Sequence, residues 1–302
     1  MAEFEILPRG PFSLAASQDF AGGFPPGIGG GAVGATNISM AFPVEGTDLS
    51  AAVELHQRED GVVIGRTDAP PSLVDAVRRQ AARSLSLDHD GTDWPAVGER
   101  DPLIGRLQQE HDYVRPVCFY SAYEAATSLV IGQRISMRQG ARVKKWLGEQ
   151  FGDRPTVDGH EFVAFPRPAR LLEATAVPGL NEKKIGWLHG IARAAREGRL
   201  DTERLRALAR EDALTALRTL PGVGEFTAEA VWLRGCGVVD ELPSSEEASL
   251  MVAREMYDRP DLDRAGLVAL AEVWRPYRMW ATVLLRVGWN REKGPRSYRQ
   301  SG

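Results

Sequence analysis

The chain has 302 residues, and its 37 lysines and arginines against 41 aspartates and glutamates give a formal net charge of −4. These proportions are those of an ordinary globular protein, long enough for two domains or one large one. The N-terminal segment lacks the basic-then-apolar pattern of a secretion signal, and no apolar run approaches the roughly 18 residues of a membrane-spanning helix. We therefore expect a cytoplasmic protein. The slightly negative charge argues only weakly against a nucleic-acid partner, because binding responds to local charge.

The two cysteines of the chain, Cys118 and Cys236, limit the kinds of site it can carry. Two thiols cannot complete a four-ligand zinc or iron–sulfur site, and a structural disulfide is not expected in the cytoplasm. We expect both side chains to be buried as small apolar groups.

The first hundred residues are predicted to form a small β-rich domain. A Gly/Pro-rich run at 22–31 indicates a loop, and Asp60-Gly61 predicts a hairpin turn. Apolar residues near helical spacing, behind two prolines, predict a helix from Ser72 to about Leu87. β-branched or alternating apolar segments indicate strands at 37–44, 51–60 and 62–67.

From about Asp101 onward, the apolar periodicity predicts an all-α body. The fold class is therefore predicted as α+β, mainly α, with domains at 1–100 and 101–302. The basic tail at 289–302 could contact phosphate, although a solvated tail is the ordinary interpretation. Helices are expected at 123–138, 140–151, 182–197, 201–210 and 212–217, and from near Pro276.

The segment Leu220-Pro221-Gly222-Val223-Gly224 predicts a tight hairpin between two helices, at about 214–235. Its glycines can turn sharply and leave backbone N–H groups uncovered at the start of the second helix. Uncovered donors at the positive end of a helix dipole form an anion site that a phosphate diester fits. The alternative is a helix–helix turn that binds nothing.

The hairpin sequence "LPGVGEFTAEAVWLRG" resembles the helix-hairpin-helix of the DNA glycosylase superfamily. Other segments are similar to its 3-methyladenine DNA glycosylase II branch, in the right order: "FEILPRGPFSL", the stretch ending in "GQRIS", "FPRPARLLEATAVPGLNEKKIGWLHG" and "WRPYRMWATVLL". The resemblance covers nearly the whole chain. It implies a small β domain before a helical body, a duplex DNA partner with a damaged base, a monomer, and a cytoplasmic location at the nucleoid.

Two features separate the chain from other branches of the superfamily. Endonuclease III-like members carry four cysteines after the last helix, and none is found there in this sequence. Bifunctional members place a lysine nucleophile where this sequence has Phe226. Without an amine no Schiff base can form, so the resemblance implies a monofunctional enzyme that uses water and has no lyase activity.

The family's essential residue is an aspartate on the loop after the hairpin, and an ungapped count from Pro221 places Glu246 there. The carboxylate would stabilise positive charge as the glycosidic bond breaks and help water attack the sugar. One extra methylene shifts the head group by on the order of 1 Å, which can cost roughly 100-fold in rate. Glu247 could substitute by a loop shift. The alternative for Glu246 is a helix N-terminal acid, with Ser244 or Ser245 as the cap.

The base pocket also departs from the family pattern. Phe226 keeps one aromatic wall, but Ala230 stands at a tyrosine position and Arg286 at a tryptophan position, with Gln133 of the GQRIS motif as a further lining residue. Electron-rich rings attract cationic alkylated purines, so their loss weakens that preference. Arg286 could pair with Glu246 and steady it, or read a neutral base by hydrogen bonding.

The resemblance assigns DNA contacts to two segments. Arg134 occupies the place where the family's best-known member inserts a leucine into the base stack, and an arginine can fill the gap left by a flipped nucleotide. Glu225 stands near the bound phosphate, where repulsion would weaken binding. No cofactor is expected beyond a monovalent cation at the hairpin carbonyls of Leu220 and Gly222. The predicted DNA-binding residues are Arg134, Ser136, Leu220, Gly222, Gly224 and Thr227.

The sequence therefore predicts a monofunctional DNA glycosylase of base excision repair that flips an alkylated or otherwise damaged base and hydrolyses its N-glycosidic bond. A non-catalytic or altered-specificity relative that binds DNA lesions is the second hypothesis. A helical interaction module without DNA binding is the third, favoured slightly by the acidic balance and Glu225.

Overall fold

In the computed structural model the described residues are 1–23 and 37–293. Most of the Gly/Pro-rich run predicted as a loop, and the end of the basic tail from 294 onward, lie outside them. The first two residues of the Gly/Pro-rich run, Gly22 and Gly23, are the last two residues of helix α1 (Leu14–Gly23). No helix among the described residues is long and apolar enough to cross a membrane.

The N-terminal part of the chain forms an antiparallel sheet of four strands, with the order β1-β4-β3-β2. Apolar side chains of the strands, such as Phe42 and Val53, share a core with Val77 of helix α2 (Val74–Ser84) and with Leu85, which follows that helix. The three predicted strands, the hairpin turn and the helix are confirmed. The first strand and α1 were not predicted. The strands are β1 (Ala2–Ile6), β2 (Asn37–Pro43), β3 (Ser50–Gln57) and β4 (Val63–Thr67).

From residue 71 to residue 293, the regular elements are helices apart from one short hairpin, β5 (Thr156–Val157) and β6 (His160–Glu161). This hairpin lies against the sheet, where Ala41 and Ala52 contact Val157. The α-helices are α2 (Val74–Ser84), α3 (Trp94–Arg100), α4 (Pro102–Glu110), α5 (Ala122–Gly132), α6 (Met137–Phe151), α7 (Pro168–Leu171), α8 (Glu182–Arg196), α9 (Thr202–Ala207), α10 (Arg210–Arg218), α11 (Glu225–Ala230), α12 (Glu247–Met256), α13 (Arg264–Leu270) and α14 (Arg278–Lys293). Shorter helical turns are η1 (Pro71–Leu73), η2 (Val231–Gly235) and η3 (Ala271–Trp274).

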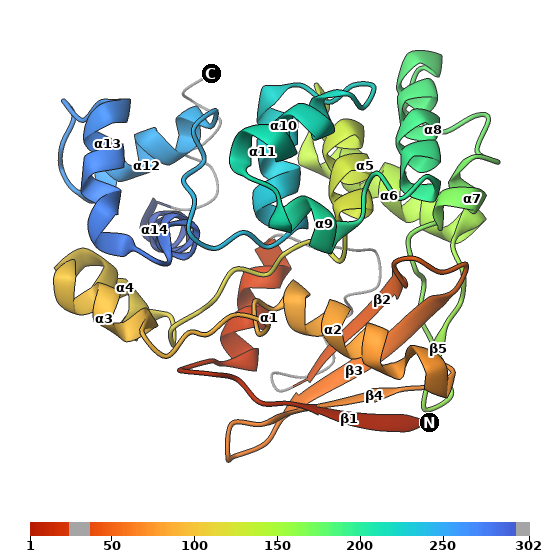
Figure 1. The fold of residues 1–302 in the computed structure, drawn as a ribbon, viewed down its shortest axis with the longest axis horizontal. Coiled ribbons are helices and arrows are strands. Elements are labelled where there is room, and N and C mark those ends of the chain that lie inside the picture. Colours follow the sequence, from red (N-terminus) through yellow and green to blue (C-terminus); the bar gives the residue numbers. More distant parts are fainter. Residues whose placement is uncertain (24–36, 294–302) are drawn as a thin grey trace.

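The helices form two groups, each around its own core (Figure 1). Helices α5 to α11 make one group, and α3, α4, α12, α13 and α14 make the other. Met279 and Val283 of α14 pack into the first core, whereas Trp280 and Leu284 pack into the second. Phe20 of α1 touches both of these cores and the core of the sheet. The protein is thus α+β and mainly α, as predicted.

The predicted domain boundary at residue 100 falls between α3 and α4. Helix α3 packs with the second helical group through Trp94 and Val97. Val117 and Tyr120, beyond the boundary, belong to the core of the sheet. The boundary itself stays a prediction. Residues of the linker at 114–120 pack into both cores, Val114 into that of the second helical group and Val117 into that of the sheet.

The helix predicted from Tyr123 ends earlier than expected. The periodicity predicted a helix over 123–138, but α5 stops at Gly132 and a new helix begins at Met137. Arg134 adopts a left-handed backbone (φ 55°), which ends a helix. Ser136 then caps α6 by accepting the N–H of Gln139, whose side chain accepts the N–H of Ser136 in return. Both cysteines are free and buried, as predicted.

Glu124 carries a testable consequence of burial. Its side chain on α5 is 1% exposed, and within the described residues its carboxylate oxygens have no hydrogen-bond partner. Burial raises the pKa of Glu124 to about 8, although the charge of Lys144 acts in the opposite direction. The folded protein therefore holds a proton that the unfolded chain releases at a lower pH.

We predict that the free energy of unfolding falls as pH rises from about 5 to about 8, because the stability associated with neutral Glu124 is lost as pH passes through its folded pKa. Glu124→Gln should flatten this fall, as measured by urea titration at a series of pH values. The substitution Glu149→Gln, at an exposed position, serves as the control. An unchanged pH profile in Glu124→Gln would contradict the prediction.

Candidate active site

The predicted hairpin is present between α10 and α11, and its two glycines have different duties. Gly222 has φ 77°, and a Cβ there would lie 2.6 Å from the ring of Trp187 on α8. Gly224 precedes α11 directly, and a Cβ on it would meet nothing within 4 Å. The fold therefore requires glycine at Gly222, whereas Gly224 leaves open space beside the first N–H groups of the helix.

The segment between α5 and α6 is tied to this hairpin. The side-chain amide of Gln133 donates to the carbonyl oxygen of Gly222 at 2.8 Å and to Thr227 Oγ1 at 3.3 Å. Lys184 Nζ on α8 donates to the carbonyl oxygen of Ile131 at 2.9 Å and to that of Gln133, which satisfies the C-terminal end of α5. Lys184 was not singled out from the sequence, because a lysine in a helix's first turn carries no distinguishing signal.

The predicted contact residues of these segments differ in exposure. Arg134 and Ser136 are exposed beside the hairpin, and Ser136 also caps α6. Leu220 and Thr227 are buried, so their side chains are not open to a ligand. The amide of Gln133, which was expected to line the base pocket, donates to the hairpin, and its place in a base pocket stays a prediction. Glu225, in the first turn of α11, is exposed.

Glu246 lies at the N-terminus of α12, and two side chains hold its carboxylate. Arg286 Nη2 of α14 is 2.8 Å from Oε1, and Ser249 Oγ donates to Oε2 at 2.6 Å. Glu246 is 20% exposed, and Arg286 is 36% exposed. The pairing of Arg286 with Glu246 was one of two hypotheses from the sequence, and its geometry is confirmed.

Glu247, the second carboxylate of the pair, turns to solvent. Its side chain is 89% exposed and lies 3.3 Å from Arg264 Nη2. The same arginine also donates to the carbonyl oxygens of Pro243 and Glu246, at 3.3 and 3.2 Å. Of the two carboxylates, Glu246 is therefore the one that the structure encloses.

A buried carboxylate on α11 fixes the loop before Glu246. Glu229 is 2% exposed, and it accepts the backbone N–H groups of Ser244 and Ser245 at 2.7 and 2.8 Å. Both serine hydroxyls and Arg210 donate to it as well. Burial raises the pKa of Glu229, but the hydrogen bonds from the two serines outweigh burial and hold this pKa below its ordinary value.

This contact corrects one interpretation from the sequence. Ser244 and Ser245 were weighed as caps of the following helix, but both donate to Glu229, and the N-cap position belongs to Glu246. Glu229 was itself missed, because a single glutamate on a predicted helix is usually solvated. The spacing of 15 and 16 residues to the serines gives no periodic signal.

The remaining predicted pocket residues on the hairpin helix are Phe226 and Ala230 of α11. Phe226 is 49% exposed and Ala230, one turn further along α11, is half-buried. Phe226 is thus a large apolar side chain open to solvent beside the hairpin. Whether these residues hold a base stays a prediction.

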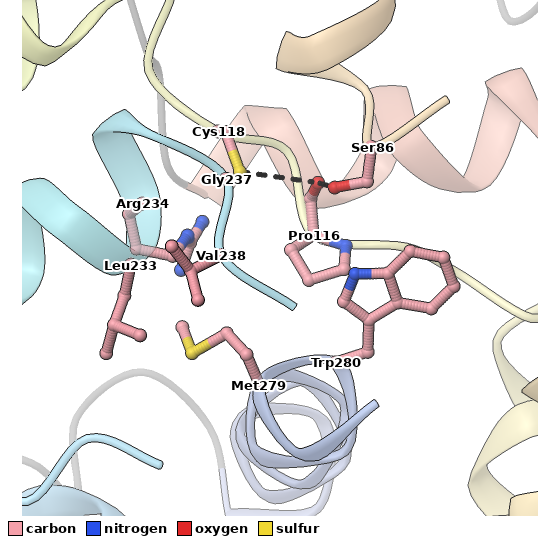
Figure 2. A pocket seen from close by; sticks show the side chains of 9 residues that line it. All are labelled: Ser86, Pro116, Cys118, Leu233, Arg234, Gly237, Val238, Met279 and Trp280. Carbon is pink, nitrogen blue, oxygen red and sulfur yellow. Dashed lines mark hydrogen bonds between the residues drawn. The ribbon is translucent and has the colours of Figure 1, made fainter. Parts of the chain in front are cut away.

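The helical turn η2, which continues α11, packs against α14. Figure 2 shows Leu233 and Arg234 opposite Met279 and Trp280 of α14, with Pro116 of the linker beside them. The side chains leave too little space for a water molecule. Arg286 lies two turns beyond Met279 on α14, so this packing fixes its position relative to the hairpin helix.

The relatives found by sequence comparison include DNA-3-methyladenine glycosylases, although no protein-family model matches the chain. It is 26% identical over 208 residues to the DNA-3-methyladenine glycosylase of Bacillus subtilis (strain 168), covering 67% of this chain and 68% of that protein. It is 28% identical over 182 residues to DNA-3-methyladenine glycosylase 2 of Escherichia coli (strain K12), covering 59% of this chain and 61% of the relative.

Solved structures share the whole fold. The 3-methyladenine DNA-glycosylase from Archaeoglobus fulgidus matches with a TM-score of 0.75 at 18% identity, covering 96% of this chain and 99% of the other. The Clostridium acetobutylicum 8-oxoguanine glycosylase/lyase, in complex with double-stranded DNA containing cytosine opposite 8-oxoG, matches with a TM-score of 0.66 at 15% identity, covering 97% and 98%.

A small antiparallel sheet before a helical body with the hairpin between α10 and α11 is the fold of the helix-hairpin-helix DNA glycosylases. Within this class, the sequence relatives of the chain are DNA-3-methyladenine glycosylases.

Because a Cβ would clash at Gly222 but not at Gly224, alanine substitutions at the two positions should affect stability differently. Gly222→Ala should lower the free energy of unfolding by roughly 1–3 kcal/mol, because it combines a left-handed backbone with a clash against Trp187. Gly224→Ala should change it by less than about 1 kcal/mol, because its φ of −90° suits alanine and the added methyl meets nothing. Thermal and urea unfolding measure both. Equal losses in the two variants would contradict this assignment.

Proposed function

We propose that this protein is a monofunctional DNA glycosylase that flips a damaged base out of duplex DNA and hydrolyses its N-glycosidic bond, with Glu246 as the catalytic carboxylate. The observation that carries the proposal is the enclosure of Glu246 between Arg286 and Ser249, on a loop tied to the hairpin through Glu229. The names of the sequence relatives, which are DNA-3-methyladenine glycosylases, support the same reaction.

The chemistry asks two things of Glu246. Its negative charge stabilises the positive charge that develops on the sugar as the bond to the base breaks. It then accepts a proton from the water that attacks the sugar. Ser249 is 6% exposed and is the fixed partner of the carboxylate. The more exposed Arg286 is the partner that can move aside when a nucleotide enters.

Hydrolysis without a lyase step follows from the residues of α11. Phe226 stands where bifunctional relatives of the superfamily place a lysine, and α11 contains no lysine. Lys184, which lies near the hairpin, already donates to two carbonyl oxygens at the end of α5. With no lysine on α11 to attack the sugar, water is the proposed nucleophile.

The hairpin and the segment after α5 would hold the DNA. Backbone N–H groups beside Gly224 would bind a phosphate at the start of α11, and exposed Arg134 would fill the gap left by the flipped nucleotide. A monovalent cation fits the hairpin only in part. Leu220 and Gly222 carbonyls already accept Val223 N–H and Gln133, so each keeps one lone pair for an ion.

The second candidate is a glycosylase of altered specificity or a lesion-binding relative. Arg286 and Ala230 stand where the family has aromatic rings, and a guanidinium 2.8 Å from Glu246 repels a cationic alkylated purine. A neutral damaged base with hydrogen-bond acceptors suits Arg286 better. The base that is released from a panel of lesions separates the two candidates.

We predict that the wild-type protein releases a base from at least one alkylated or deaminated duplex in a single-turnover assay. Glu246→Gln should lower the release rate by roughly 100-fold or more, because the amide carries no charge and accepts no proton. Glu246→Asp should retain part of the rate. The substitution Glu247→Gln, at the exposed neighbouring carboxylate, is the control. Full activity in Glu246→Gln would rule out Glu246 as the catalytic carboxylate.

DNA binding itself is tested without catalysis. Binding to duplex should weaken as salt rises, because phosphate contacts release counterions. Arg134→Ala should weaken binding to a duplex with an abasic site several-fold more than binding to intact duplex, measured by fluorescence anisotropy. A binding constant that does not respond to salt would favour the interaction-module hypothesis over both DNA-binding ones.

A further inference from the structure

We infer that Glu229 is the positioning residue of the reaction. Its buried carboxylate holds the Ser244-Ser245 turn and thereby sets the distance from Glu246 to the sugar. The inference rests on the proposed function, because it concerns how the catalytic carboxylate is aimed. Glu229 touches neither DNA nor the reacting atoms, and it acts through the loop.

The hydrogen bonds around Glu229 leave this loop little freedom. One carboxylate oxygen accepts the N–H and the hydroxyl of Ser244, both at 2.7 Å, and the other accepts the N–H of Ser245 at 2.8 Å and its hydroxyl. Two successive residues are thus fixed by backbone and side chain together. Glu246 is the next residue in the chain, so its Cα can move little while these contacts persist.

Arg210 completes the arrangement from a second helix. Its guanidinium lies at the N-terminus of α10, and it donates to Glu229, to Ser244 Oγ at 2.8 Å and to the carbonyl oxygen of Leu242 at 3.3 Å. A carboxylate that is 2% exposed requires such donors, because an unpaired buried charge is very costly. The loop therefore supplies the donors that Glu229 needs, and Glu229 determines where the loop sits.

The contacts of Glu229 also join the hairpin helix α11, at the predicted phosphate site, to the loop that carries Glu246. Glu229 lies one helical turn after Glu225, on the helix whose first N–H groups face the predicted phosphate. Movement of the hairpin helix is therefore transmitted to the loop of Glu246 through hydrogen bonds. Glutamate has one methylene more than aspartate, so the loop must place its carboxylate to within about 1 Å of the sugar position. A misplacement of about 1 Å can by itself cost roughly 100-fold in rate.

A positioning role and a purely structural role predict different kinetics. The substitution Glu229→Gln keeps the size of the side chain, but its NH2 group faces the N–H and hydroxyl donors of one serine, and the neutral amide loses the ion pair with Arg210. We expect the single-turnover rate of base release to fall about 100-fold, with the dissociation constant for lesion duplex changed less than about 3-fold. Loss of fold stability alone would lower neither the rate of the folded protein nor its affinity.

The control is another carboxylate paired with an arginine and a hydroxyl, away from the site. Glu45 contacts Arg83 and Thr202 between the sheet and α9. Glu45→Gln should lower thermal stability and keep the release rate of the wild type at a temperature where both variants are folded. A fall in rate for Glu45→Gln equal to that for Glu229→Gln would overturn the inference.

A second variant covers the case in which Glu229→Gln does not fold. Ser245→Ala removes one hydroxyl donor and keeps the N–H contact, so we expect a fall in rate of about 10-fold without a change in duplex affinity. Hydrogen exchange of the Ser244 and Ser245 amides should be faster in either variant. Wild-type rates and unchanged amide exchange in the variant that folds would overturn the inference.

The result also separates this inference from the proposed function. If the wild-type protein releases no base from any lesion, the proposed function fails, and the positioning role fails with it. If the wild-type protein is active, Glu246→Gln is inactive and Glu229→Gln is fully active, the proposed function stands and only the positioning role is overturned.

Discussion

A carboxylate buried to 2% exposure must be surrounded by donors, and Glu229 obtains them from the loop that precedes Glu246. This requirement connects Glu229 on the hairpin helix to Glu246, the N-cap residue of α12, which lies 17 positions later in the sequence. Arg210 brings α10 into the same contact, so both helices of the hairpin determine where the loop lies. The remaining parts of the candidate site are arranged around this fixed loop, with α14 contributing Arg286 from the other helical group.

A second set of contacts fixes the other edge of the site. Gln133 joins the segment after α5 to the Gly222 carbonyl, and Lys184 holds the end of α5 from α8. Arg134 is thereby presented from a left-handed backbone position beside the hairpin. Both edges are held by side-chain contacts to backbone groups at helix ends, where donors and acceptors lack partners within their own helix. The candidate site lies where helices end, and its geometry depends on how those ends are satisfied.

The fold was predictable where local patterns were strong. Strand alternation in β2 and β3 and the apolar spacing of α8 gave elements close to those observed. The helix predicted over 123–138 failed because the apolar period continues across a break that Arg134 and the Ser136 cap create. Helix α1 and strand β1 gave weak signals, since a short segment gains most of its stability from tertiary packing. Of the site, Glu246 and its partner Arg286 were named from the sequence, but Glu229 and Lys184 were not.

The sequence alone determined the hairpin, because Gly222 and Gly224 set backbone options that few other residues allow. It also determined the order of the motifs that carry the family resemblance, and the carboxylate that follows them. Only the tertiary structure decided which of Glu246 and Glu247 is enclosed, and what holds it there. The physical reason is that these contacts join residues on different helices, and the partner of a buried charge is set by packing, which leaves no periodic trace along the chain.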